Sequence, residues 1–170
     1  MKKASRTLAF GLLIAMFFIA GCAHKISATG INDAKFEEKT GFWAGRISLQ
    51  VQSEPAQAFF AGFELKGQAD TGELTLISPL GNILGIMRWT PLDATLEQGG
   101  NIRRFASTDE LLAQTTGAAI PLSALFDWLS GKNVTAPGWT ADLSQLGNGR
   151  ITAQRTSPAP QANLRIVLDK

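Results

Sequence analysis

The chain has 170 residues, of which 45% are hydrophobic, with 16 basic and 14 acidic side chains. This length and composition predict one globular domain with a single hydrophobic core. The few basic residues form no extended cluster, which excludes a nucleic-acid surface built on a Lys/Arg patch.

Residues 1–21 have the pattern of a bacterial export signal. Three basic residues precede an apolar run of 13 residues, 8–20, which is shorter than the roughly 20 residues needed to span a bilayer. The run ends in Ile19-Ala20-Gly21-Cys22, which resembles the lipobox, a cleavage site before a cysteine that becomes lipidated. An ordinary small-residue cleavage site is the alternative. Cys22 is the only cysteine and so has no disulfide partner; we predict that it carries a lipid anchor.

Removal of residues 1–21 takes away three basic residues and no acidic one, which leaves 13 basic and 14 acidic side chains.

Residues 22–41 then form a predicted tether, with a short helix around Asn32 to Lys39. The stretch from His24 to about Lys39, roughly 16 residues, would have a root-mean-square reach of about 20 to 24 Å as a flexible chain. The adjacent pair Arg103-Arg104 is expected on a solvent-exposed strand edge.

Residues 42–170 predict a mainly β domain. Apolar and polar residues alternate in 43–51, 58–67, 72–78 and 83–89, the pattern of half-buried strands. Shorter strands are expected at 94–97, 102–105, 150–155 and 163–168, and short turns predict an antiparallel meander. The predicted inward set is Trp43, Gly45, Ile47, Leu49, Val51, Phe59, Ala61, Phe63, Leu65, Leu74, Leu76, Ile83, Met87 and Trp89.

Two helices are predicted after the sixth strand. Ser107 and Glu110 have the spacing of a capping box, and Gly117 is a natural stop for that helix. The second helix, 121–131, begins with a proline in its first turn. Its apolar face is expected to lie on the sheet through Leu122, Leu125 and Leu129, with Phe126 and Trp128 widening it.

Little in the sequence favours an enzyme or a metal site. The sole histidine, His24, lies two positions from Cys22, so a Ser-His-Asp arrangement has no base in the domain. Imidazole and thiolate ligands for a metal are missing for the same reason, and no cofactor is expected. A glycosidase-like carboxylate pair remains an alternative, drawn from Glu64, Glu73, Asp109, Asp127 and Asp142, although solvation or helix capping explains most of these.

Five segments in order resemble the LolB family of outer-membrane lipoprotein receptors: FWAGRISLQV, FFAGFEL, GELTLISPLGNILGIMRW, LLAQTTGAAIPLSALFDWLSG and GW at 138–139. The resemblance runs from about residue 42 to 168. It implies an open, unclosed antiparallel half-barrel whose concave apolar face is covered by helices. The residues expected to line its acyl cavity are Trp43, Ile47, Leu49, Phe59, Phe63, Leu65, Leu74, Leu76, Met87, Trp89, Leu122, Leu125 and Leu129.

The same resemblance implies the function. Members accept lipoproteins from the periplasmic carrier LolA and insert them into the outer membrane, and Ala23 after the lipidated cysteine suggests sorting to that membrane. The leucine of the Pro-Leu-Gly turn, here Leu80 between Pro79 and Gly81, is the expected insertion residue. We expect a monomer anchored on the periplasmic face, with no enzymatic activity. The alternative is an envelope lipid carrier or sensor of the same fold that does not insert lipoproteins.

Overall fold

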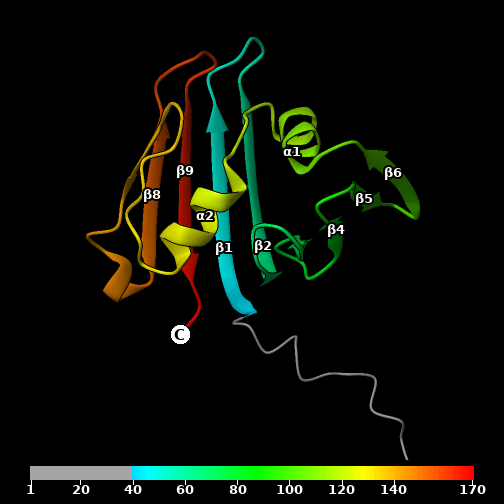
Figure 1. Ribbon diagram of the computed structural model, residues 1–170, viewed down its shortest axis with the longest axis horizontal. Helices are drawn as coiled ribbons and strands as arrows, with labels where there is room; N and C mark the ends of the chain where they lie inside the picture. The colour runs from blue at the N-terminus through cyan, green and yellow to red at the C-terminus, as the bar shows by residue number, and fades with distance from the viewer. Residues whose placement is uncertain (1–39) are drawn as a thin grey trace, which may run out of the picture. The chain divides into compact units, whose positions relative to one another are not determined.

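The computed structural model describes residues 40–170, which form an antiparallel sheet with two α-helices on one face (Figure 1). The helices are α1 (Thr108–Thr116) and α2 (Leu122–Leu129), and a 3-10 turn, η2, covers Leu146–Asn148. Cys22 and the short helix predicted near residues 32–39 lie outside the described residues. The strands are β1 (Gly41–Val51), β2 (Gln57–Gly67), β3 (Gly72–Ile77), β4 (Ile83–Trp89), β5 (Ala94–Gln98), β6 (Asn101–Phe105), β7 (Trp139–Asp142), β8 (Arg150–Arg155) and β9 (Ala162–Leu168).

The first strand lies in the interior of the sheet, whose order is β6-β5-β4-β3-β2-β1-β9-β8-β7. Two antiparallel meanders, β1–β6 and β7–β9, meet where β1 pairs with β9, so that Leu49 lies between Phe59 and Leu164. Among the described residues β6 and β7 remain free edges, which confirms the predicted open, unclosed and mainly β fold. Local alternation predicts the neighbours within each meander, whereas the pairing of the first and last strands is non-local and has no such signal.

The helices link the two free edges of the sheet. The chain leaves β6 at one edge, passes through α1 and α2, and enters β7 at the other edge. Figure 1 shows α2 lying across β1 and β9. The Phe126 ring of α2 meets Trp43 and Trp89 edge to face, with ring centroids 5.5 and 6.3 Å apart, an arrangement that aromatic pairs prefer. We call the face of the sheet under α2 the inner face.

Local signals fix the helix ends. The backbone N–H of Glu110 donates to Ser107 Oγ (3.1 Å), and the Glu110 carboxylate accepts from the N–H of Ala106 (2.9 Å). This confirms the predicted cap, with the return bond one residue earlier than in the standard box. Gly117 ends α1 at φ +68°, a left-handed conformation that glycine adopts at little cost. Pro121 is the N-cap of α2 rather than its first-turn residue, because its backbone is extended (ψ 104°) while its carbonyl accepts the N–H of Leu125.

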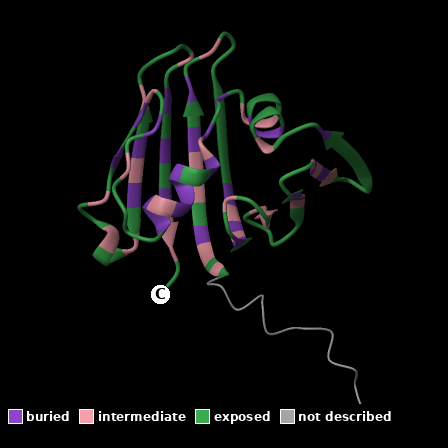
Figure 2. Cartoon of the chain, in the orientation of Figure 1, coloured by how far each residue is buried: buried purple, intermediate pink, exposed green. Residues whose placement is uncertain are grey.

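The core lies between the inner face and the helices. Buried and exposed residues alternate along β2, β4 and β9, and Figure 2 shows α2 mostly buried while the edge strand β6 is largely exposed. The buried indoles of α2 and β7 satisfy their polar atoms. Trp128 Nε1 donates to the carbonyl of Val134 (3.0 Å) and Trp139 Nε1 to that of Ala119 (2.9 Å). Burial of these rings therefore costs no unpaired donor.

Two features differ from the prediction. β7 has only 4 residues, too few for its alternation to be recognised, although the Gly-Trp pair at 138–139 marks its start. Ile83 was predicted inward with Met87 and Trp89, and this was wrong. The β3–β4 register shifts between Leu76 and Ile77, so that Ile83 pairs with Ile77 and is exposed. A β-bulge of this kind adds one residue and reverses the alternation beyond it.

Candidate functional site

An apolar pocket lies on the inner face, between the strands and the C-terminal turn of α1. Its volume is about 440 Å³, within the range of roughly 300–1,000 Å³ that is typical of small-ligand pockets. It is lined by Leu49, Val51, Ala56, Gln57, Ala58, Phe59, Leu76, Met87, Thr115 and Thr116.

Strand register brings the apolar residues of this pocket together. Leu49 of β1 pairs with Phe59 of β2. Four residues further along β2, Phe63 pairs with Leu76 of β3. Met87 of β4 pairs with Leu74, the next inward residue of β3. Because side chains two apart on a strand share a face, the inward residues of four adjacent strands converge on one space.

The chemistry of the pocket suits hydrocarbon. Among its lining residues none is ionisable. The hydroxyls of Thr115 and Thr116 donate to the carbonyls of Leu111 and Leu112 at 2.7 Å each, so neither hydroxyl needs a polar partner from a ligand. Phe59 is 38% exposed and stands at the solvent-accessible part of the pocket. A ligand of this site would be held by apolar burial rather than by charge.

The structure separates the predicted cavity residues into two groups. Leu49, Phe59, Leu76 and Met87 line the pocket. The other predicted residues pack in the adjoining core, and a role for them in contacting acyl chains stays a prediction. Of these, Trp43, Ile47 and Leu74 are partly buried, and Phe63, Leu65, Trp89, Leu122, Leu125 and Leu129 are buried.

Sequence reasoning missed several lining residues. Val51 shares the inward alternation of β1 and could have been added on that ground. Gln57, Thr115 and Thr116 carry polar groups, so an apolar pattern does not select them. The two threonines end α1, and their place at the pocket depends on how the helix packs on the sheet.

The β3–β4 turn presents Leu80 to solvent. The N–H of Gly81 donates to the carbonyl of Ser78 (2.9 Å), and the N–H of Ser78 donates to the carbonyl of Asn82 (2.8 Å). Gly81 has φ +85°, which favours glycine, so the turn is fixed without any contribution from the leucine side chain. Leu80 is 88% exposed. The turn therefore leaves this side chain free for an intermolecular contact.

The candidate carboxylates lie elsewhere. Glu64, Glu73 and Asp127 pair with Lys66, Arg88 and Lys132 at 3.4, 2.8 and 3.3 Å. Asp109 lies in the first turn of α1. The N–H of Ser144 donates to the Asp142 carboxylate and holds the pKa of that group below its ordinary value. In the described part of the chain no group of three or more potential metal ligands occurs, and no helix there is long and apolar enough to cross a membrane.

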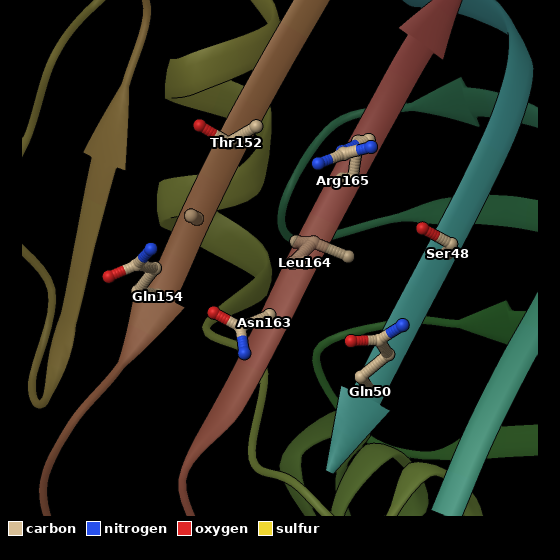
Figure 3. A pocket seen from close by; sticks show the side chains of 8 residues that line it. Ser48, Gln50, Thr152, Gln154, Asn163, Leu164 and Arg165 are labelled. Carbon is tan, nitrogen blue, oxygen red and sulfur yellow. The ribbon is translucent and has the colours of Figure 1, made fainter.

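A second pocket, of about 390 Å³, lies on the opposite, outer face of β1, β9 and β8. Figure 3 shows its side chains projecting from the three strands, with the helix behind them. Hydroxyl, amide and guanidinium groups dominate its lining, which suits water better than hydrocarbon. The residues are Ser48, Gln50, Thr152, Ala153, Gln154, Asn163, Leu164 and Arg165. The apolar pocket is therefore the better candidate for a lipid site.

The fold and the apolar pocket of the inner face define a class of protein in which an open antiparallel sheet and its covering helices leave space for an apolar ligand. The family model described as Outer membrane lipoprotein LolB matches residues 42–166. The chain belongs to the LolB family.

Relatives that carry the name Outer-membrane lipoprotein LolB match most of the chain. The protein of Cupriavidus metallidurans is 32% identical over 155 residues, which cover 90% of this chain and 74% of the relative. That of Cupriavidus pinatubonensis is 32% identical over 149 residues, 86% of this chain and 70% of the relative. That of Bordetella petrii is 26% identical over 176 residues and covers 89% and 87% of the two chains.

Proposed function

We propose that this protein accepts the acyl chains of lipoproteins from the periplasmic carrier LolA and inserts these lipoproteins into the outer membrane. In this proposal a lipidated Cys22 holds the domain, residues 42–170, on the periplasmic face. The observation that carries the proposal is the apolar pocket of about 440 Å³ under the helices of a LolB-family sheet. No catalytic step is required, because the reaction is a transfer between apolar environments.

The energetics explain why such a pocket is needed. Transfer of an acyl chain into water costs about 0.8 kcal/mol per methylene, or about 12 kcal/mol for a chain of roughly 16 carbons. A triacylated lipoprotein therefore does not cross an aqueous compartment unaided. A pocket without ionisable groups, lined by Leu49, Leu76 and Met87, offers an environment close to that of the bilayer. Its partly exposed residue Phe59 gives an acyl chain a route in and out.

Leu80 supports the delivery half of the proposal. Its side chain stands almost entirely in solvent on a turn whose hydrogen bonds do not involve it. Burial of one leucine in lipid stabilises by about 1.5 to 3 kcal/mol. That energy is too small to anchor a protein but large enough to orient one that Cys22 already holds at the membrane.

A two-step reconstitution tests the function. Labelled lipoprotein is transferred first from the carrier to this protein and then from this protein to liposomes. Leu80→Glu should preserve folding and the first step but block the second. A carboxylate must be desolvated to enter lipid, at a cost of up to about 2.5 to 3.5 kcal/mol on translocon-based insertion scales.

Leu92→Glu is the matched control, since Leu92 is 89% exposed on the β4–β5 turn; it should leave both steps intact. Equal delivery by the wild type and Leu80→Glu would refute a role for Leu80. A wild type that binds acyl chains but never delivers them would instead be a lipid carrier or sensor of the same fold, for which the pocket alone suffices.

A further inference from the structure

Exposed large apolar side chains are unevenly distributed over the described residues. Phe60 and Ile83, which are 55% and 63% exposed, lie near Leu80 at one end of β2–β4. Ile77 of β3 pairs with Gly62 of β2 on one side and with Ile83 of β4 on the other. Phe60 lies two residues from Gly62 toward the β3–β4 turn, and it shares the face of Gly62. We call Phe60, Ile77, Leu80 and Ile83 the tip patch. It lies on the outer face, around the turn that carries Leu80.

The tip patch adjoins the exposed part of the apolar pocket. Phe59 lines the pocket, and the next residue, Phe60, belongs to the patch because consecutive strand side chains point to opposite faces. Phe63 of β2 pairs with Leu76 of β3, and the two strands are antiparallel. Phe59, four residues before Phe63, and Leu80, four residues after Leu76, therefore lie at the same end of the sheet. A ligand that leaves the pocket past Phe59 therefore emerges next to the patch.

The patch contains no charged residue. The outer-face charges closest to it are Arg46, which pairs with Gly62 in the row of Ile77, and Glu64, which lies two residues from Gly62 and forms an ion pair with Lys66 (3.4 Å). Arg88 pairs with Glu73 through Nε (2.8 Å) and with Glu97 through Nη1 (3.1 Å). The hydrogen bond to Glu97 is the main reason that the pKa of Arg88 is raised above its ordinary value. The Glu73–Arg88 row lies about 13 Å along the strands from Ile77, at about 3.3 Å per residue. The carboxylates closest to the patch, Glu64 and Glu97, are therefore paired with cations, and Arg46 is the charge that borders the patch.

We propose that the tip patch is a contact surface for the phospholipid bilayer, so that Phe60 and Ile83 enter the membrane interface together with Leu80. This rests on the proposed function and extends its single insertion residue to a surface. The three exposed side chains offer on the order of 300–400 Å². That area is below the roughly 600–800 Å² per partner of a stable protein–protein interface, which favours a lipid surface over a second copy or the carrier.

The tip patch can reach the bilayer to which Cys22 anchors the protein. Gly41 follows Cys22 by 19 positions, and a chain of that length spans at most about 63–68 Å. β3 leads from the Gly41 end of the sheet to the patch and has 6 residues, or about 20 Å. Anchor and patch can therefore occupy one membrane, with the pocket opening at the level of the lipid.

The test uses the mature chain with Cys22→Ala, which has no other cysteine. Single cysteines introduced as Phe60→Cys, Leu80→Cys or Ile83→Cys are labelled with an environment-sensitive fluorophore. Vesicles of phosphatidylethanolamine and phosphatidylglycerol should shift the emission of all three labels to the blue. Leu92→Cys and Phe42→Cys are matched controls, since both side chains are exposed at the Gly41–Gly67–Gly72 end of the sheet; their labels should not respond.

The outcomes separate this surface from the proposed function. A response at Leu80 without one at Phe60 and Ile83 would overturn the patch and leave the insertion residue standing. No response at any of the three would overturn both. Responses that need the carrier, or that grow with protein concentration without vesicles, would assign the patch to a protein partner and overturn the bilayer contact.

A functional readout completes the test. In the two-step reconstitution, Phe60→Ser and Ile83→Ser should each slow delivery to liposomes about five- to tenfold, with receipt from the carrier and thermal stability unchanged. Phe42→Ser and Leu92→Ser should deliver normally. Full delivery by the double variant Phe60→Ser/Ile83→Ser would refute the proposal.

Discussion

Phe126 is predicted to be the residue that fastens α2 to the sheet. Its ring lies edge to face against Trp43 of β1 and Trp89 of β4, at centroid distances of 5.5 and 6.3 Å, and is buried. Phe126→Ala removes a buried aromatic ring, a change that usually costs about 3–5 kcal/mol. Each aromatic pair contributes about 0.5–1.5 kcal/mol beyond its buried area. Because both pairs are lost, we expect the upper half of that range.

Urea unfolding of the mature chain with Cys22→Ala, followed by tryptophan fluorescence, measures the effect. Phe126→Leu should cost less than about 1.5 kcal/mol because it conserves most of the volume. Leu92→Ala, on an exposed turn, should change the free energy of unfolding by less than about 0.5 kcal/mol. Phe126 does not line the apolar pocket, so binding of a fluorescent fatty-acyl probe should persist below the unfolding transition. A loss of stability under about 1.5 kcal/mol for Phe126→Ala would refute the fastening role.

Three further predictions concern the anchor and the pocket. Cys22→Ala should give a soluble, folded protein, while mass spectrometry of the mature wild type should find a lipid on Cys22; an unmodified N-terminus would contradict the anchor. Leu76→Phe should fill the pocket and weaken binding of the acyl probe, with an overpacking cost of about 1–3 kcal/mol. Phe63→Leu should lower stability but weaken binding of the acyl probe less than Leu76→Phe does. A loss of binding equal to that of Leu76→Phe would place Phe63 in the lipid site.

Much of the fold could be predicted because each local signal has a direct physical cause. Alternation in β1 and β2 reflects one buried and one exposed face, and the Ser107 cap and the Gly117 stop mark α1 by their hydrogen bonds and dihedral angles. The bulge that exposes Ile83 could not be foreseen, because one extra residue between paired strands has no composition of its own.

The site was predicted only in outline. A leucine between Pro79 and Gly81 is unusual in a turn, but its predicted role in insertion came from the resemblance to the LolB family and stays a prediction. The pocket could not be separated from the core, since Met87 and Phe63 are both apolar, inward and buried although only Met87 lines it. Empty space between a sheet and a helix depends on how far apart they pack, and no periodicity in the sequence encodes that distance.

The helical crossing from β6 to β7 has a mechanical consequence. In a closed barrel the circumference is fixed by an unbroken ring of interstrand hydrogen bonds, so widening the interior breaks some of them. Here the ring is completed between Phe105 and Trp139 by a covalent strap that contains α1 and α2. The two edges can separate by straightening or sliding that strap while every strand ladder stays intact. Interior volume is then not set by the strand ladders, so the proposed acceptance of acyl chains does not require a pocket of one fixed size.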